Sequence, residues 1–442
     1  MFSQALGRDA GPPRPAFAVS GCFRGGKRMR IGFISTRLNG TDGVSLEVEK
    51  WAMVLRRMGH ELFYCAGELG GHAASGTLIP QLHFHHQSII VLSQRAFGDG
   101  AERDGEKLAD EIYERADEIR APLRKFIREN RLDLIIVQNA LTTPMNLPLG
   151  VALTGLIAEL GINTIAHHHD FHWERQRYQV SSVINLLDTA FPAKLPTIQH
   201  VAINSIAQRR LRERRGIDSV VIPNVHDFAA PPPGIEAYNR DLREMLGLTG
   251  DDLFVLQPTR VIQRKGIEMA IELVRLLELP DAHLFITHRA GDEGLSYWHW
   301  LKREAGMMRV DLRLIDHLIG PERARMNGHK IYSLWDVYPH ADLVTYPSTY
   351  EGFGNALLEA IYFRRLIVVN RYPVYNADIR PLGFEVIELD GFVDEGAVQK
   401  TRELLNAPER VRAMAEKNYA IAQEHFSLEV LEAKLRELLA AC

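Results

Sequence analysis

The sequence predicts an α/β protein of two doubly wound, parallel-sheet (Rossmann-like) domains that face a cleft. Short β-branched runs alternate with longer amphipathic runs from Met29 onward, which is the pattern of βαβ units. The alternation lapses in a proline-containing stretch at 222–250 and then restarts. A chain of 442 residues is also too long for one ordinary core, so two domains of about 200 residues each are expected.

The first half supplies the strands and helices of one parallel sheet. Strands are expected at 30–36, 61–65, 134–138, 164–168 and 200–204, with the clearest helices at 45–58, 105–129 and 148–160. Residues 1–28 are rich in Gly, Pro and Arg and lack an apolar signal-peptide core, so they are interpreted as a disordered extension or a misassigned start, with a transit peptide as a further alternative. The N-terminal domain is therefore expected over 29–225.

The second half repeats the alternation. Strands are expected at 253–259, 282–287, 310–315, 343–346 and 366–370. A last helix at 428–441 carries leucines at helical spacing and should pack this stripe against a neighbour. The C-terminal domain is expected over 226–426, followed by the helical segment 427–442.

Composition excludes several classes of protein. The formal net charge of −4 argues against a broad nucleic-acid-binding face. Cys22, Cys65 and Cys442 are far apart and form no CxxC pair, so a disulfide framework and a zinc ribbon are both disfavoured. The scarcity of cysteine indicates a reducing compartment, so a cytoplasmic protein is expected. The absence of an apolar run of about 18 residues excludes an ordinary membrane span and leaves peripheral membrane contact open.

The most informative stretch lies at 346–360, where a loop after a strand opens a helix. Glycines allow close approach of the backbone there, so the amides of Phe353, Gly354 and Asn355 can meet a phosphate at the helix N-terminus. Glu351 would face a hydroxylated group, and Glu359, one turn into the helix, would reach a ribose. The alternative is an ordinary loop with solvated glutamates.

A second candidate element follows the strand expected at 253–259. Arg260 and Lys265, with Arg264 between them, provide fixed positive charge just before a helix. A guanidinium and an ammonium together suit a diphosphate leaving group, whose charge grows as its bond breaks. A charged face exposed to water is the alternative.

Three consecutive histidines end the strand expected at 164–168. Side chains alternate along a strand, so His167 and His169 should share one face. Histidine with Asp170 could bind zinc or iron, but one short cluster without a separate carboxylate motif is weak support, and no metal site is assigned. Packed histidines are the alternative reading.

The loop at 40–44, which contains Gly43, joins the first strand to a helix. It lacks the G-x-G-x-x-G motif of dinucleotide-binding sites and the G-x-x-x-x-G-K-[ST] phosphate loop of nucleoside triphosphatases. Elsewhere in this domain, basic residues hint at an anionic or polyhydroxylated acceptor, although ordinary surface charge explains them equally well. These residues are Arg37, His172, Arg175 and Arg177, with Asp170 beside them.

With these elements in this order, residues 29–441 resemble the retaining family 4 glycosyltransferases of GT-B fold. The family's E-x7-E element is matched by Glu351 to Glu359, and its diphosphate-binding pair by Arg260 and Lys265. His169-Asp170 resembles its N-domain histidine motif. Two further matches are the glycine loop at 40–44, which reads Gly-Thr-Asp-Gly instead of a Gly-Gly pair, and the interdomain loop at 222–227, which has Val225 in place of a glycine.

The resemblance implies a role for each matched residue in a hexosyltransferase. Arg260 and Lys265 would neutralise the diphosphate, and Glu359 would hold the ribose. Glu351 would orient donor hydroxyls with the 353–355 backbone, His169 would contact the sugar near C6, and Gly43 would lie beneath it. Transfer from a UDP- or GDP-linked hexose to an acceptor hydroxyl would proceed with retention, without a metal or other cofactor. The segment 427–442 would cross back to the N-terminal domain.

Three other functions remain open from the sequence. A nucleotide-sugar epimerase of the same architecture would interconvert donors without an acceptor, and a non-catalytic subunit would bind a donor without consuming it. A histidine-dependent metal enzyme is the third. The sequence does not determine the donor base or sugar, the acceptor, the linkage or the oligomeric state.

Overall fold

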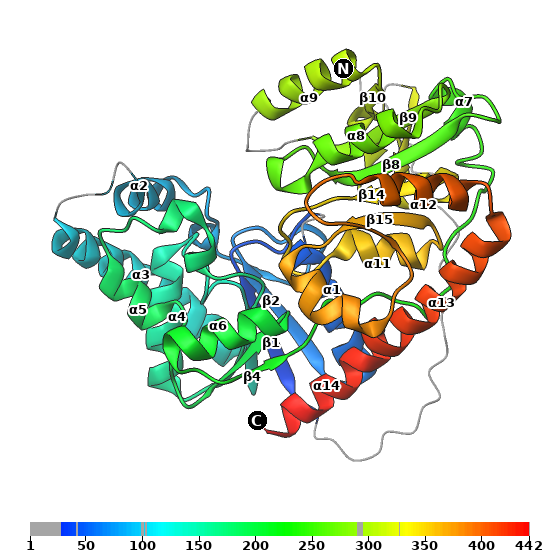
Figure 1. The fold of residues 1–442 in the computed structure, drawn as a ribbon. Helices are drawn as coiled ribbons and strands as arrows, with labels where there is room; N and C mark the ends of the chain where they lie inside the picture. Colours follow the sequence, from blue (N-terminus) through cyan, green and yellow to red (C-terminus); the bar gives the residue numbers. More distant parts are fainter. Residues whose placement is uncertain are drawn as a thin grey trace, which may run out of the picture.

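The structure is a computed structural model that describes residues 28–40, 43–98, 101, 104–289, 295–326 and 328–441. Its described residues form two large parallel sheets, one in each half of the chain, with helices on both faces of each sheet (Figure 1). The predicted fold class is confirmed. Residues 1–27 of the N-terminal extension, Thr41 and Asp42 of the glycine loop and Cys442 lie outside the described residues.

The N-terminal sheet has seven parallel strands among the described residues, in the order β3-β2-β1-β4-β5-β6-β7. The strands are β1 (Arg30–Ser35), β2 (Glu61–Ala66), β3 (Thr77–Leu78), β4 (Leu134–Gln138), β5 (Asn163–His168), β6 (Ile198–Ala202) and β7 (Ser219–Val221). The helices are α1 (Gly43–Arg57), α2 (Gln87–Ala96), α3 (Gly105–Glu129), α4 (Leu147–Leu160), α5 (Ile184–Ala190) and α6 (Ser205–Arg215).

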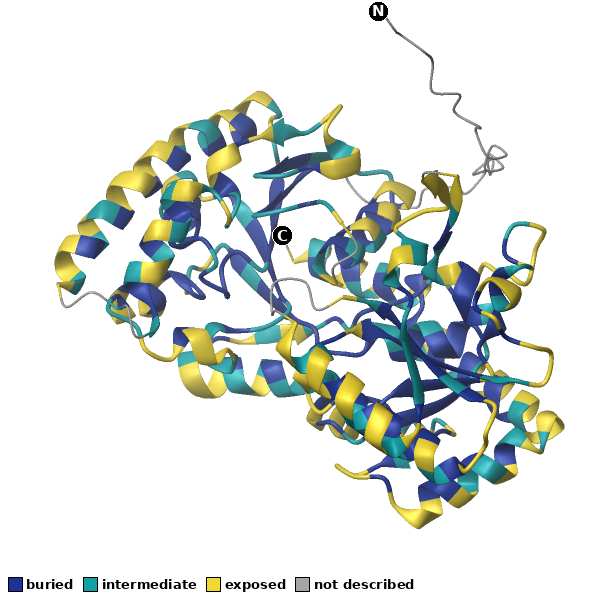
Figure 2. Ribbon diagram, turned by 90° about the horizontal axis from the view of Figure 1, so that it is seen from above, coloured by how far each residue is buried: buried dark blue, intermediate teal, exposed yellow. Residues whose placement is uncertain are grey.

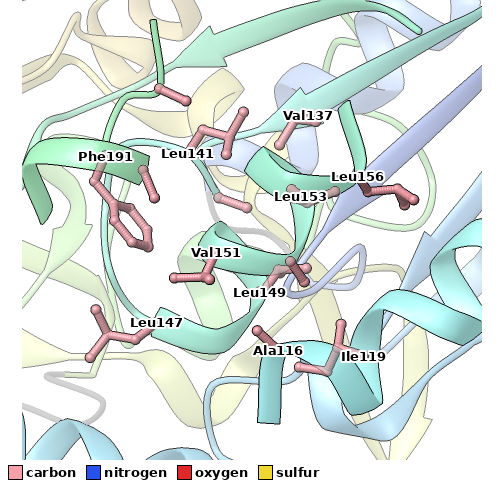
Figure 3. Close-up of a cluster of buried hydrophobic side chains, with 14 of the residues drawn as sticks. Ala116, Ile119, Val137, Leu141, Leu147, Leu149, Val151, Leu153, Leu156 and Phe191 are labelled. Atoms are coloured by element: carbon pink, nitrogen blue, oxygen red, sulfur yellow. The ribbon is translucent and has the colours of Figure 1, made fainter. Parts of the chain in front are cut away.

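Apolar side chains fill both faces of this sheet. On one face, α3 and α4 pack against β4 through residues such as Ile119, Leu153 and Val137, with the Phe191 ring beside them (Figure 3). On the other face, Trp51 of α1 is buried against Phe33 of β1. A sheet buried on both faces needs nearly continuous apolar strands, as in the β4 sequence LIIVQ.

The C-terminal sheet has six parallel strands in the part of the chain that is described, in the order β10-β9-β8-β14-β15-β16. The strands are β8 (Leu253–Arg260), β9 (Ala282–His288), β10 (Asp311–Leu314), β14 (Leu343–Tyr346), β15 (Leu366–Asn370) and β16 (Ile387–Leu389). The helices are α7 (Leu242–Met245), α8 (Ile267–Leu277), α9 (Ser296–Met308), α10 (Leu334–Val337), α11 (Asn355–Tyr362), α12 (Glu395–Leu405) and α13 (Pro408–Phe426).

A small third sheet lies between β10 and α10 and was not expected from the sequence. It consists of β11 (Ile319–Gly320), β12 (Ala324–Met326) and β13 (His329–Ser333), with β12 antiparallel to β13. β12 is exposed along its length. Such short strands carry too few apolar residues to show an alternating pattern.

Helix caps determine where a strand ends and the next helix begins in the loops near the site. The side-chain Oδ1 of Asn204 accepts a hydrogen bond from the backbone amide of Ala207 at 2.7 Å and so caps the N-terminus of α6. The helix ends at Gly216, which adopts the left-handed conformation. Because Asn204 already belongs to the helix cap, β6 ends at Ala202, two residues before the end predicted from the sequence.

The last helix, α14 (Leu428–Ala440), leaves the C-terminal domain after α13 and packs beside α1 (Figure 1). Its leucines, including Leu431 and Leu435, join the core of the N-terminal sheet. Figure 2 shows the strands of both domains enclosed by helices whose outer faces are exposed. Among the helices of the described ranges, none is both long and apolar enough to cross a membrane.

Candidate active site

Loops that follow the carboxyl ends of strands in both sheets contact one another. Asn204, after β6, donates from Nδ2 to the carbonyl oxygen of Gly352, after β14, at 2.7 Å. Asn224, after β7, donates from Nδ2 to Oδ1 of Asn355, the first residue of α11, at 2.8 Å. Open parallel sheets bind ligands beyond the carboxyl ends of their strands, so the candidate site lies where these loops meet.

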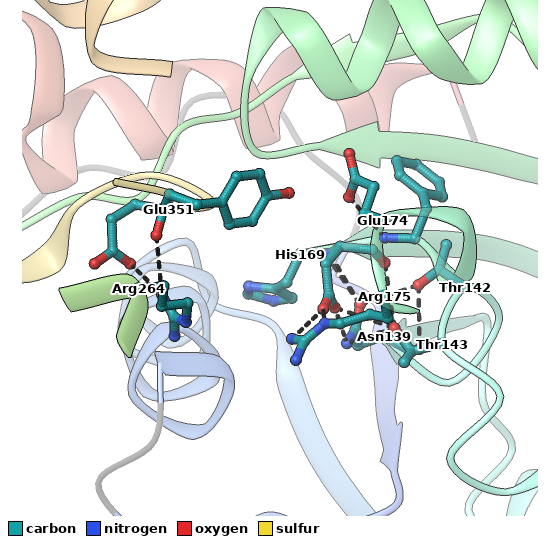
Figure 4. Close-up of polar contacts among 11 residues, drawn as sticks. Asn139, Thr142, Thr143, His169, Glu174, Arg175, Arg264 and Glu351 are labelled. Atoms are coloured by element: carbon teal, nitrogen blue, oxygen red, sulfur yellow. Dashed lines mark hydrogen bonds and ion pairs between the residues drawn. The ribbon is translucent and has the colours of Figure 1, made fainter. Parts of the chain in front are cut away.

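Two cations on the turn after β8 bind one carboxylate on the loop after β14. Arg264 Nη1 lies 2.9 Å from Oε2 of Glu351 (Figure 4). Lys265 Nζ donates to Oε1 of the same carboxylate. Burial by itself would raise the pKa of Glu351, but the two cations outweigh burial and lower this pKa. Glu351 is therefore ionised, and the three side chains carry one net positive charge.

Arg260, the last residue of β8, adds a third cation at the same place. Its side chain is exposed, and its backbone pairs with His288 of β9. Burial lowers the pKa of Lys265, and the charges of Arg264 and Arg260 lower it further, against the opposing effect of Glu351. The structure thus brings Arg260 and Lys265 together, as the sequence predicts.

Helix α11 begins beside this cluster, directly after Gly354, whose backbone conformation is one that residues with a side chain rarely adopt. Gly354 has φ of +141°, and a Cβ added to it would lie 2.4 Å from the hydroxyl oxygen of Tyr372. This hydroxyl donates to the carbonyl oxygen of Phe353 at 2.6 Å, while the Phe353 ring is buried against Phe426. The Phe353 side chain therefore belongs to the core, and its backbone belongs to the site.

Gly43, which begins α1, faces the start of α11 from the other domain. A Cβ added to Gly43 would lie 3.6 Å from Nδ2 of Asn355. Gly43 and Asn355, predicted from separate motifs, therefore lie side by side. A larger residue at either position would narrow the space above the α11 N-terminus.

Glu359 lies one turn into α11 and is partly buried. Its Oε2 accepts from the hydroxyl of Tyr338 at 2.9 Å. Burial raises the pKa of Glu359, and Tyr338, Lys50 and Lys265 offset this effect only in part. The carboxylate thus lies within the electrostatic reach of the Lys265 cluster, but it has no basic side chain bonded to it among the described residues.

We expect Glu359→Gln to stabilise the ligand-free protein at neutral pH. A carboxyl whose pKa is raised in the folded state costs stability as pH rises from its ordinary pKa to its folded pKa, and the cost persists above that. Glutamine keeps an acceptor for Tyr338 without the charge. Thermal denaturation from about pH 4 to about pH 8 should show a difference in melting temperature that grows with pH. If Glu359→Gln were less stable than the parent at every pH, the ionised Glu359 carboxylate would not be destabilising the folded protein, and the raised pKa would be wrong.

His169 lies on the N-terminal side of the site, between the Arg264–Glu351 pair and the cluster around Asn139 (Figure 4). Oε1 of Gln138 lies 3.2 Å from Nε2 of His169 and 3.0 Å from Nδ1 of His167. The two histidine rings lie 4.4 Å apart between centroids, so they share one face of the strand end, as predicted. His167 is buried and stacks on Trp51, whereas His169 is partly exposed.

Asp170 lies in a polar cluster with Asn139, Thr143 and Arg175. Its Oδ1 accepts from Asn139 Nδ2 at 2.8 Å and from Thr143 Oγ1 at 3.0 Å, and its Oδ2 bonds Arg175. Burial by itself would raise the pKa of Asp170, but Arg175 and these hydrogen bonds lower it. Asp170 thus holds Arg175 instead of facing a ligand directly.

The other two acceptor-side candidates lie apart from this cluster. Arg37 stacks over the ring of Phe84, with 5.4 Å from its Cζ to the centroid. His172 is turned toward α5 and α6: burial lowers its pKa to about 4, and the charge of Arg215 adds to this effect. The structure therefore does not bring His172 to Asp170, although the two are close in sequence.

Several residues of the site had not been assigned from the sequence. Arg264 stood inside a candidate motif, and its adjacency to Lys265 was the available signal. The others are polar or aromatic residues without a motif, whose partners come from distant parts of the chain. They are Gln138, Asn139, Asn204, Asn224, Tyr338 and Tyr372.

The two facing parallel-sheet domains and the cationic site between them define a glycosyltransferase of GT-B fold. Residues 239–421 match the family described as "Glycosyl transferases group 1". The chain belongs to the family 4 glycosyltransferases.

Two relatives are 35% identical to this chain over the residues that align. The mannosylglucosylglycerate synthase of Petrotoga mobilis aligns over 82% of this chain and 86% of its own length, and that of Thermotoga maritima over 93% and 100%. These likenesses support glycosyl transfer and do not favour the epimerase alternative.

Solved structures share the fold at low sequence identity. A glycosyltransferase from Rickettsia africae matches with a TM-score of 0.66 at 13% identity, covering 93% of this chain and 97% of its own. Anabaena HepE, solved with UDP and glucose, matches with a TM-score of 0.61 at 16% identity, covering 94% and 100%.

Proposed function

We propose that this chain transfers a hexosyl group from a nucleoside-diphosphate sugar to an acceptor hydroxyl with retention of anomeric configuration. The observation that carries the proposal is the meeting of Lys265, Arg264 and Glu351 with the N-terminus of α11, opposite His169. Cations and free helix amides held in place before reaction stabilise charge that develops on a departing diphosphate.

The donor would bind by exchanging partners within this cluster. The diphosphate replaces Glu351 at Lys265 and Arg264, and Arg260 adds charge from the edge of the sheet. The released carboxylate of Glu351 then accepts hydrogen bonds from hydroxyls of the hexose. Glu359, further along α11, accepts from the ribose, so the two glutamates hold the two ends of the donor.

Transfer would follow from the positions of these groups. The departing diphosphate leaves an oxocarbenium-like sugar, and the acceptor hydroxyl attacks from the face that the leaving group has just left, which gives retention. His169 contacts the hexose near C6 from the N-terminal side. The fixed cations supply the positive charge that Mg²⁺ supplies in other transferases, so activity is expected without added metal.

The acceptor is proposed from the relatives' names. A product called mannosylglucosylglycerate contains mannose, glucose and glycerate, so its last step can join a mannosyl group to glucosylglycerate. We propose the same step here, with mannose linked to either GDP or UDP. The acceptor is then a small molecule with one carboxylate.

We expect nucleoside diphosphate to be released only when donor and acceptor are both present. The test incubates the protein with GDP-mannose, UDP-mannose or UDP-glucose, with and without glucosylglycerate and with and without EDTA. Release and the anomeric configuration of the product are followed by NMR. An α-linked donor should give an α-linked product at a rate that EDTA leaves unchanged.

Two outcomes would contradict this proposal. Conversion of one nucleotide sugar into another without acceptor would indicate an epimerase. Binding of donors without consumption, across all acceptors with free sugar hydroxyls, would indicate a non-catalytic subunit.

A further inference from the structure

Arg175 presents a guanidinium to solvent from an enclosed anchor. It lies in the turn between the 3-10 helices His172–Glu174 and Gln176–Tyr178, just after β5. Its side chain is 52% exposed, whereas the side chain of its partner Asp170 is 12% exposed. The charge of Arg175 therefore reaches solvent, while the group that positions it does not.

The anchor is rigid and ionised. Asn139 and Thr143 donate to one oxygen of Asp170, and Arg175 binds the other. Asn139 also accepts from the amide of His169 through Oδ1 at 3.1 Å, which ties the anchor to the histidine of the donor site. An arginine held this way loses little conformational freedom when it binds a ligand.

One edge of the Arg175 guanidinium remains for a ligand. The bonds to Asp170 come from Nε and Nη2. Nη1 makes no hydrogen bond or ion pair with any residue in the described ranges. Because the guanidinium has five N–H groups in a planar fork, Nη1 and the second hydrogen of Nη2 can together bind a carboxylate.

The surroundings favour an anion in spite of Asp170. Arg177 lies over the ring of Tyr178, 4.5 Å from its centroid, and both Arg177 and Arg175 act on the ionisation of this tyrosine. Two guanidinium groups and one carboxylate leave one net positive charge. The nearby Glu174 is paired with Arg210 at 2.9 Å and adds no net charge.

The position of Arg175 relates it to the donor site. Tyr350, in the C-terminal domain, is close enough for Arg175 and Asp170 to act on its ionisation, and burial raises its pKa to about 12. The carbonyl oxygen of this tyrosine accepts from Arg264 at 3.1 Å. In Figure 4, Arg175 extends from the Asn139 cluster toward the side on which Arg264 and Glu351 lie. Tyr350 therefore lies near both cationic positions: its side chain is influenced by Arg175, and its backbone carbonyl binds Arg264.

We infer that the Nη edge of Arg175 binds the carboxylate of the acceptor, and that Asp170 is the residue that positions it. This inference rests on the proposed function, because it concerns the acceptor of that reaction. The guanidinium anchors the anionic end of the acceptor on the N-terminal side. The sugar end is thereby directed toward His169 and the donor.

The test compares two acceptors that differ in one group. Glucosylglycerate carries a carboxylate where glucosylglycerol carries a neutral hydroxymethyl group. The parent protein should have the lower KM for glucosylglycerate. In Arg175→Ala, this KM should rise about 10- to 100-fold, the range for loss of a charge-assisted pair, while the KM for glucosylglycerol changes much less. Arg175→Lys should recover only part of the preference.

Arg124→Ala is the matched control. Arg124 pairs with Glu159 at 2.5 Å between α3 and α4, near the amino ends of the strands and away from the site. The Arg124→Ala variant should keep the parent's preference for glucosylglycerate over glucosylglycerol. Two outcomes would overturn this inference and leave the proposed function standing. In the first, Arg175→Ala transfers hexose to both acceptors with the same preference for glucosylglycerate as the parent. In the second, the parent itself transfers hexose to both acceptors and shows no preference between them. Failure of the parent to transfer hexose to either acceptor would count against the proposed function as well.

Discussion

Replacing Lys265 by methionine is expected to lower kcat of hexosyl transfer by about 10²- to 10³-fold, the effect of removing one preorganised donor from a developing anion. Methionine keeps much of the apolar stem and removes the ammonium that bonds Glu351. Arg264 remains, so residual activity is expected. Steady-state release of nucleoside diphosphate at saturating donor and acceptor measures the effect.

The same variant should also lose stability, and this loss has to be separated from the loss of catalysis. Breaking a buried pair by removing one partner typically costs about 3–5 kcal/mol, less here because Arg264 still faces Glu351. The double variant Lys265→Met with Glu351→Gln removes both charges and should regain stability without regaining activity. A double variant that regained turnover would contradict the role of Lys265.

Lys330→Met provides the matched control for this experiment. Lys330 is also partly buried and ion-paired, 2.6 Å from Asp241, but it belongs to the small sheet outside the site. The control should lose some stability and keep its kcat. If Lys265→Met lowered kcat no more than Lys330→Met, the diphosphate position would be wrong.

The large parallel sheets could be predicted because their strands are buried on both faces. Runs such as LIIVQ in β4 and LIVVN in β15 are apolar except at their last residue, and both strands begin and end at the predicted residues. The edge strands β3, β7 and β16 have two or three residues each, too few for a pattern. Their pairing depends on neighbours that are distant in the sequence.

The site was predictable to the extent that its chemistry is local in sequence. Arg260 and Lys265 follow one strand, and Glu351 and Glu359 flank one helix start, so their spacing carries the signal. The bond from Tyr338 to Glu359 joins residues 21 apart, and that from Asn204 to Gly352 joins residues 148 apart. Such partners are set by how the domains fold together, which no short motif records.

The histidines illustrate the same limit. Strand alternation correctly predicts that His167 and His169 share a face, because the period of a strand is fixed. His172 lies beyond the strand, at the start of the short 3-10 helix His172–Glu174, where the period of a strand no longer applies, and it is enclosed near α5 and α6. Nearness in sequence to Asp170 therefore gave no information about its direction.

Gly354→Ala is expected to weaken donor binding and lower kcat/KM by about 100-fold, since a displacement of about 1 Å at a reacting centre can cost this much. The backbone φ of +141° is one that L side chains rarely adopt, and the new Cβ would lie 2.4 Å from the Tyr372 hydroxyl. Tyr372 is fully buried and cannot turn aside, so the loop must shift. Titration calorimetry with the nucleoside diphosphate and thermal denaturation measure the two effects.

The two causes, backbone strain and steric contact, can be separated with two more variants. Gly383→Ala has φ of +87° and no atom within 4 Å of the added Cβ, so it carries strain alone and should lose stability without losing donor affinity. Gly354→Ala with Tyr372→Phe removes the contacting hydroxyl and should bind donor better than Gly354→Ala, although the hydrogen bond to Phe353 is lost as well. If the double variant bound no better, the contact would not be the reason for glycine at this position. Glycine would then be needed because its φ, which other residues rarely adopt, sets the direction in which the backbone amides at the start of α11 point.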